Sequence, residues 1–228
     1  MLRLPTIPEE RPQSVPEDVW IKLTTLILDV YNAKNYPFTE NCIKFFRKYH
    51  SRKTVLKGRV IDETHCAVLF EQTIEELELI DVAKSRRFFL TTKVRDADWP
   101  YFAIIELLDK IIFFDTRSRL KALTIEPGKV RFQRNFIIQL AFRFKNLEKL
   151  AIRSVQIKPL DFDVLCCGFP KLKELDLSYS NLKNLTRICK LRNLEVLILR
   201  GLNVEKMEYI QDLWSLEMLK VLDISGAR

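Results

Sequence analysis

The amino-acid sequence predicts an α/β solenoid, in which parallel strands stack on a concave side and helical or irregular segments return along a convex side. One observation is an apolar spacing that recurs three times in the last third of the chain: Leu172-x-x-Leu175-x-Leu177, Leu194-x-x-Leu197-x-Leu199 and Leu219-x-x-Leu222-x-Ile224. The other is that the first two copies reach a further apolar residue, Leu182 or Val204, five positions later. This is the spacing of leucine-rich repeats, whose units bury their leucines only against neighbouring units.

Earlier copies of the same spacing extend the array towards the N-terminus. Clear copies begin at Leu120 and Leu147, and a weaker one begins at Ile74. From Leu120 onward the first positions are 27, 25, 22 and 25 residues apart, within or near the roughly 20–29 residues of this repeat class. The step from Ile74 to Leu120 is 46 residues, about two periods. We therefore expect one degenerate unit between them, with residues 88–90 or 104–107 as its strand.

The first 60 residues predict a helical module in front of the repeats. Ser14-Val15-Pro16-Glu17 has the form of a capping box, so a helix is expected to begin there. Apolar residues follow at three- and four-residue steps: Val19, Leu23, Leu26, Ile27 and Val30. Thr39 can cap a second helix, and the basic stretch from Arg47 to Arg59 would close the module. The predicted division is residues 1–60 for the helical module and 61–228 for the repeats.

The net charge of +8 is unevenly distributed along the chain. Between Arg117 and Lys158 lie eleven basic residues against two acidic ones, Glu126 and Glu148. Such a basic strip can attract nucleic acid or an acidic protein. A solvated outer face of the array is the simpler interpretation, because no aromatic and basic RNA-binding motif accompanies the strip.

The composition excludes most catalytic and membrane functions. With five glycines the chain forms no phosphate-binding loop, and its five cysteines form no C-x-x-C pair that could join His50 or His65 in a metal site. We therefore expect a non-enzyme without catalytic residues, cofactor, metal or small-molecule substrate. No apolar run approaches the roughly 18 residues of a membrane span, and residues 1–16 do not form a signal peptide. The protein is expected in the cytoplasm or nucleus with reduced cysteines.

The side chains that alternate with the inward leucines should line the concave sheet, because side chains of a strand point alternately to its two faces. These positions predict a partner-binding surface on the last three strands, made of Glu174, Asp176, Ser178, Val196, Ile198, Arg200, Val221 and Asp223. Val196, Ile198 and Val221 would form an apolar cluster rimmed by charge. Either this cluster contacts a partner or another segment of the chain covers it.

The helical module, the basic stretch, the weak first repeat and the ending Leu222-Asp223-Ile224-Ser225-Gly226 together resemble the Zyg-eleven and Zer-one family. Proteins of that family are substrate receptors of cullin-2 RING ubiquitin ligases. In them an N-terminal box binds elongin C, a proline-containing box contacts cullin-2, and an armadillo-like region follows the repeats. The resemblance implies that the helical module binds the adaptor through Trp20, Leu23, Leu26, Ile27, Val30 and Pro37.

The chain stops at Arg228, directly after the strand of a repeat, and no armadillo-like region follows. We therefore expect a fragment, a truncated form, or a protein that meets a partner at this end. The leading functional hypothesis is a substrate-recruiting or scaffolding subunit of a cullin-type ubiquitin ligase. The alternative is a leucine-rich-repeat scaffold unrelated to ubiquitin, which binds an acidic protein or nucleic acid through its basic face.

Overall fold

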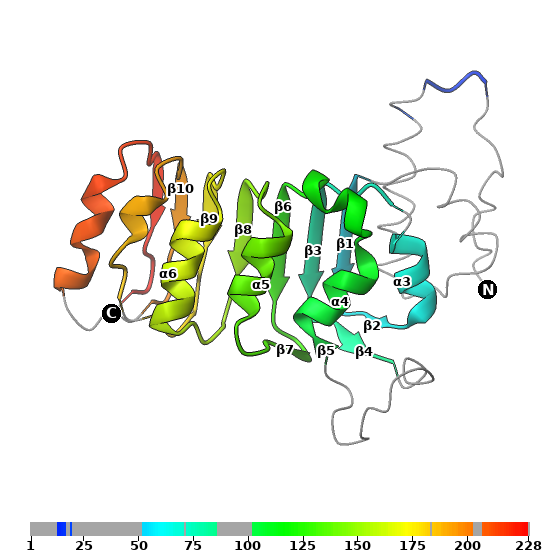
Figure 1. Cartoon of the computed structure of the whole chain (residues 1–228), viewed down its shortest axis with the longest axis horizontal. Coiled ribbons are helices and arrows are strands. Elements are labelled where there is room, and N and C mark those ends of the chain that lie inside the picture. Colours follow the sequence, from blue (N-terminus) through cyan, green and yellow to red (C-terminus); the bar gives the residue numbers. More distant parts are fainter. Residues whose placement is uncertain are drawn as a thin grey trace.

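A computed structural model describes residues 13–16, 19, 52–70, 72–85, 102–182, 184–202 and 207–227. Seven parallel strands form one open sheet, and the helices cover one of its faces (Figure 1). In spatial order the strands are β1 (Lys53–Lys57), β3 (Glu76–Ile80), β6 (Ala122–Glu126), β8 (Lys149–Ile152), β9 (Glu174–Asp176), β10 (Val196–Ile198) and β11 (Val221–Asp223). The order follows the sequence, as expected for a leucine-rich-repeat solenoid, so the predicted fold class is confirmed.

The convex segments change in character along the solenoid. The first ones are α-helices, namely α3 (Glu63–Phe70), α4 (Ile104–Ile111), α5 (Phe136–Arg143) and α6 (Pro159–Gly168). The last ones are the 3₁₀ helices η4 (Ile188–Lys190) and η5 (Met207–Ser215), and a further 3₁₀ helix, η3 (Phe114–Arg119), follows α4. Two small parallel sheets lie where strands lead into the convex side, β2 (Val60–Ile61) with β4 (Ala83–Lys84) and β5 (Phe102–Ala103) with β7 (Val130–Arg131). The helical or nearly helical returns predicted from the sequence are therefore present.

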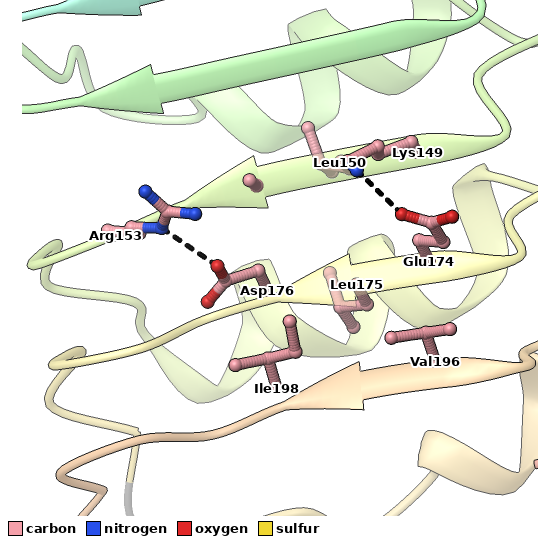
Figure 2. Close-up of a pocket in the computed structure, with 9 residues that line it drawn as sticks. Lys149, Leu150, Arg153, Glu174, Leu175, Asp176, Val196 and Ile198 are labelled. Atoms are coloured by element: carbon pink, nitrogen blue, oxygen red, sulfur yellow. Dashed lines mark hydrogen bonds and ion pairs between the residues drawn. The ribbon is translucent and has the colours of Figure 1, made fainter. Parts of the chain in front are cut away.

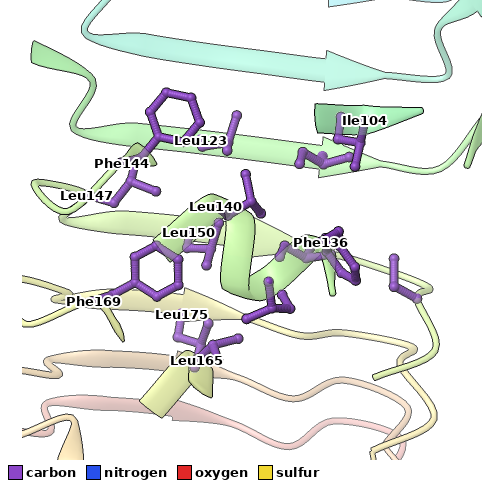
Figure 3. Close-up of a cluster of buried hydrophobic side chains, with 14 of the residues drawn as sticks. Ile104, Leu123, Phe136, Leu140, Phe144, Leu147, Leu150, Leu165, Phe169 and Leu175 are labelled. Atoms are coloured by element: carbon purple, nitrogen blue, oxygen red, sulfur yellow. The ribbon is translucent and has the colours of Figure 1, made fainter. Parts of the chain in front are cut away.

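The strand register aligns the leucines of successive repeats. Leu123 pairs with Leu150, Leu150 with Leu175, and Leu175 with Leu197. All four side chains are at most 1% exposed. Figure 3 shows Leu123, Leu150 and Leu175 in one core with Phe144 and Phe169. Phe144 and Phe169 each stand three residues before the first leucine of the next repeat and are buried. Each repeat thus adds one layer to a single continuous core.

A left-handed backbone residue ends the strand segment of nearly every repeat. It stands two residues after the second inward side chain, and φ is positive there at Gly58, Asp81, Ser154, Tyr179, Gly201 and Gly226. The backbone N–H of this residue donates to the neighbouring repeat, as from Gly201 to the Ser225 carbonyl at 2.9 Å. Pro127 occupies the position in one repeat, where the proline ring fixes φ at a negative value.

The repeats begin earlier than the sequence suggested. Strand β1 pairs with β3 throughout its length, with Thr54 opposite Leu77 and Leu56 opposite Leu79. It lies within residues 1–60, so the end of the basic stretch up to Arg59 is part of the repeats and does not close a helical module. Residues 20–51, which would form most of that module, lie outside the described residues.

The expected degenerate unit between Ile74 and Leu120 is absent from the sheet. Strand β3 hydrogen-bonds directly to β6, with Leu77 opposite Leu123. Residues 104–107 are the start of helix α4, whose apolar side chains are buried, and residues 88–90 lie outside the described residues. The step of 46 residues is therefore one long repeat, in which α4 supplies the convex segment.

Candidate protein-interaction surface

Strand pairing arranges the predicted concave residues in rows across the sheet. Lys149, Glu174, Val196 and Val221 follow one another in one row, on β8, β9, β10 and β11. The next row holds Ala151, Asp176, Ile198 and Asp223. The structure therefore brings Glu174, Asp176, Val196, Ile198, Val221 and Asp223 together on three neighbouring strands.

A shallow hollow of about 60 Å³ lies on the concave face between β8 and β10 (Figure 2). Ala151 lines its floor, because this small side chain stands between larger ones and is only 2% exposed. Val196 and Ile198 form the wall on β10 and stay partly exposed. The hollow therefore combines an apolar interior with access from solvent.

Two ion pairs flank the hollow, one from Lys149 of β8 and one from Arg153 directly after β8, and each reaches a carboxylate of β9. Lys149 Nζ lies 2.7 Å from Glu174 Oε2, and Arg153 Nε lies 2.8 Å from Asp176 Oδ2 (Figure 2). A second Arg153 nitrogen lies 3.3 Å from Glu126, and these contacts, the hydrogen bond to Asp176 first, raise the pKa of the Arg153 guanidinium. Because each charge is matched by a neighbour of opposite sign, the hollow presents no net charge to a ligand.

An arrangement of arginine, aspartate and serine recurs on the last repeats. Asp223 Oδ1 accepts hydrogen bonds from the Ser225 backbone N–H at 3.0 Å and hydroxyl at 2.5 Å, while Arg200 Nε donates to Asp223 Oδ2 at 2.6 Å. The bonds from Ser225, followed by that from Arg200, lower the pKa of Asp223 to about 2. Asp176 makes the same contacts with Ser178 and Arg153.

The predicted concave residues differ in their accessibility. Asp176 and Ser178 are 7% and 2% exposed, so they shape the face and leave little surface for a partner. Arg200 is exposed, and Val221 is 49% exposed beside Val196. The predicted adaptor-binding residues Trp20, Leu23, Leu26, Ile27, Val30 and Pro37 lie outside the described residues.

A row of alternating charges, not noticed in the sequence, crosses the solenoid where the strands begin. It occupies the residue after the first position of each repeat: Arg52, Glu75, Lys121, Glu148, Lys173, Glu195 and Lys220. Ion pairs connect its members, with Lys121 Nζ 3.1 Å from Glu75, Lys173 Nζ 2.7 Å from Glu148 and Lys220 Nζ 2.6 Å from Glu195. The sequence contains this pattern, because the charge of the residue at this position changes sign from each repeat to the next.

The basic strip from Arg117 to Lys158 is partly neutralised within the chain. Arg117 and Arg143 both contact Asp109 of α4, at 2.6 and 2.9 Å. Lys121, Lys149 and Arg153 pair with glutamate and aspartate residues as described above. The strip is therefore not one continuous basic surface.

Metal-binding groups and reactive thiols are two kinds of chemical site to consider among the described residues. None of them forms a group of three His, Cys, Asp or Glu side chains that could hold a metal ion. Burial raises the pKa of the Cys66 and Cys166 thiols to about 12, so neither thiol ionises readily at neutral pH. Within the same part of the chain no helix is long and apolar enough to cross a membrane.

The chain is similar to one curated protein and to several solved structures, whereas no known family model matches it. It is 35% identical over 122 residues to Gastrulation-defective protein 3 of Caenorhabditis elegans, a match that covers 54% of this chain and 17% of that protein. Internalin C2 of Listeria monocytogenes superposes with a TM-score of 0.48 at 14% identity, over 85% of this chain and 78% of that one. A Leptospira interrogans leucine-rich-repeat protein gives 0.48 at 16% identity, over 83% and 46% of the two chains.

Proposed function

We propose that this leucine-rich-repeat chain is a non-enzymatic scaffold that binds an extended segment of another protein across strands β8, β9 and β10. The observation that carries the proposal is the hollow above Ala151, with its apolar wall of Val196 and Ile198. A concave sheet of this kind supplies a continuous surface for a partner. The hollow holds only about 60 Å³, so a short aliphatic side chain of the partner is the group that fits into it.

The electrostatics of the hollow support an uncharged side chain as its occupant. A charged group would lose its hydration there and would compete with the ion pairs of Lys149 with Glu174 and of Arg153 with Asp176. Lys149, Arg153 and Glu174, which are exposed or half-buried, can hydrogen-bond the backbone of an extended peptide at the rim. Affinity would come from the apolar contact, and orientation from the polar rim.

Filling the hollow tests this proposal. Full-length protein carrying Ala151→Leu should lose partners that the unmodified protein captures from a cell lysate, as measured by quantitative mass spectrometry. Ile138→Asp, a change at a 45% exposed position on helix α5, is the matched control and should retain them. Thermal unfolding must show that both variants fold. Equal capture by a folded Ala151→Leu variant would contradict the proposed site.

We further propose that the partner is a substrate recruited to a cullin-RING ubiquitin ligase, in the cytoplasm or nucleus. This proposal is supported by the resemblance of the N-terminal segment to an adaptor-binding box and rests on Leu23, Leu26 and Pro37. Elongin C and cullin-2 are the expected adaptor and cullin.

A binding assay with purified components tests the ligase proposal separately. Immobilised full-length protein should retain elongin C and, through it, cullin-2, and Leu26→Asp should abolish retention of both. Ala151→Leu serves as the control, because the hollow lies on the repeats. Failure of the unmodified protein to retain elongin C would end the ubiquitin interpretation and leave the concave site unaffected.

A further inference from the structure

The loops that lead from the convex segments into the strands lie side by side along one edge of the solenoid. Backbone hydrogen bonds join their ends in sequence, from Glu148 N–H to the Lys121 carbonyl and from Lys173 N–H to the Glu148 carbonyl, both at 2.7 Å. We call residues 113–121, 142–148, 167–173, 189–195 and 214–220 the strand-start edge. Segments far apart in the sequence thus form one linear surface.

Four successive loops of this edge each carry an exposed cation. These residues are Arg119, Lys145, Lys171 and Arg192. None of them forms an ion pair with the part of the chain that the structure describes, whereas the nearby carboxylates of Glu148 and Glu195 are engaged by Lys173 and Lys220. The edge also carries Asp115 and Glu217, and its ten basic residues outnumber its four acidic ones, so it has a surplus of positive charge.

Large aromatic rings also protrude from the strand-start edge. Phe114 is 72% exposed at the start of η3, Phe142 is 75% exposed in the last turn of α5, and Trp214 is 87% exposed near the end of η5. Cations lie over two of the rings, Arg117 at 5.3 Å from the Phe114 centroid and Lys145 at 5.7 Å from the Phe142 centroid. Packing within the described repeats does not account for the exposure of these rings.

We propose that the strand-start edge binds a single-stranded nucleic acid. The phosphates contact Arg119, Lys145, Lys171 and Arg192, and bases stack on Phe114 and Phe142. Basic residues interleaved with exposed aromatic rings are the usual construction of surfaces that bind single strands. The surface goes beyond the concave protein site, since it uses another edge and another set of side chains.

The aromatic rings decide between a nucleic acid and an acidic protein segment. Carboxylates of an acidic peptide would use the cations alone and leave Phe114 and Phe142 exposed. Bases have flat faces that cover such rings, and they are free to do so only when the strand is unpaired. The combination of both residue types therefore favours a single strand over a peptide or a duplex.

The test measures fluorescence anisotropy of a labelled oligouridine of about 12 nucleotides, within the range of single-strand site sizes, titrated with the full chain. Binding should weaken as salt rises, with a slope of log affinity against log salt of about −0.7 for each neutralised phosphate. The double variant Lys145→Gln, Lys171→Gln should flatten the slope by about 1.4, corresponding to two phosphates.

The matched control is the double variant Lys129→Gln, Lys158→Gln. Both lysines are exposed and lie where strands end, at the opposite edge, so this variant removes the same charge. It should leave affinity and salt slope nearly unchanged. Phe142→Ala should reduce affinity about tenfold, the loss of one stacked base, with the salt slope retained. Its side chain is largely exposed, so the core should remain intact.

Several results would overturn the proposal. One is that the oligouridine does not bind at about 100 µM protein, which is the weak end of nonspecific affinity. Another is an affinity that does not depend on salt. A third is an equal loss of affinity in the two double variants. Tighter binding of a duplex of the same length, or of a polyglutamate peptide, would also overturn it. The last result would assign the edge to an acidic protein instead.

Discussion

Tyr179 has φ of +59°, and its ring lies directly over Gly201 in the neighbouring repeat. A Cβ atom on Gly201 would stand 2.6 Å from the Tyr179 ring, well inside van der Waals contact. Gly201 also has φ of +62°, a conformation that other residues adopt only with strain. Two separate effects therefore require glycine here.

Comparison with Gly58 separates these two effects. Gly58 has the same φ of +62°, but a Cβ there would meet no atom within 4 Å. We expect Gly58→Ala to lower the free energy of unfolding by about 1 kcal/mol through backbone strain. Gly201→Ala should lower it by about 2–3 kcal/mol, because the steric overlap adds to the strain. Urea unfolding measures both, and equal losses would mean that the Tyr179 ring moves aside freely.

His65 lies between an acidic side chain, Asp62, and a basic one, Arg59, near the start of helix α3. Its Nδ1 lies 2.6 Å from Asp62 Oδ1, and Arg59 donates to its Nε2 at 2.9 Å. Because an arginine cannot accept a hydrogen bond, Nε2 must be the acceptor and the proton sits on Nδ1. Burial lowers the pKa of His65 below 6.5; Asp62 opposes this shift and Arg59 adds to it.

The sign of this pKa shift predicts how stability depends on pH. Below the ordinary histidine pKa the unfolded chain binds a proton at His65 more readily than the folded chain, so stability is lost as pH falls from 6.5 towards the lowered value. We expect His65→Gln to reduce the loss of stability between about pH 7.5 and about pH 5.5, which span the ordinary value. Urea unfolding at both pH values checks this, and an unchanged difference would exclude His65 as its source.

At the scale of elements, six of the seven sheet strands were predictable, because buried alternate leucines leave a repeating trace in the sequence. Strand β1 was not predicted, because its inward residues are Thr54 and Leu56 and the threonine interrupts the apolar pattern. Residues 104–107 were ambiguous, because a short apolar run fits a strand and a buried helix equally well. The buried side chains continue to Leu108 and Ile111, at helical spacing.

The site was predictable only as a set of positions. Alternation along each strand placed Val196 and Ile198 on the concave face, but it could not show that Ala151 leaves a hollow beside them. Nor could it show that Asp176 is buried under Arg153. Both depend on which residues face each other across strands, and that register appears only in the folded sheet.

Asp109 of helix α4 connects this helix to η3 and to α5 through hydrogen bonds. Its carboxylate accepts hydrogen bonds from Arg117 of η3 at 2.6 Å and from Arg143 of α5 at 2.9 Å. Asp109→Asn should lower the free energy of unfolding by about 1–3 kcal/mol, the range for hydrogen bonds to charged groups. Asp115→Asn, at an exposed position of η3, is the control and should change it by less than about 0.5 kcal/mol. Similar effects of both changes would show that Asp109 does not hold these elements together.

At the scale of the whole molecule, stability is expected to vary along the solenoid, because each repeat contacts only its neighbours. Leu150 and Leu175 are completely or almost completely buried, whereas Leu222 of β11 and Ile224 directly after it are 43% and 54% exposed. The central strands therefore lose more contacts on opening than β11 does.

Hydrogen exchange should reveal this gradient. Backbone amides of β8 and β9 should exchange most slowly, and those of β11 should exchange faster by at least about tenfold, equivalent to about 1.4 kcal/mol of local opening. Mass spectrometry of peptic fragments resolves the two regions. Uniform protection from β8 to β11 would indicate that the solenoid opens as a single unit.

The row of alternating charges from Arg52 to Lys220 also favours the correct order of the repeats over an order in which one repeat is skipped. Each member faces an opposite charge on the adjacent repeat and would face a like charge on the next but one. A chain that skipped a repeat while folding would bring equal signs together along this row. The leucines cannot detect such an error, because they are nearly the same in every unit.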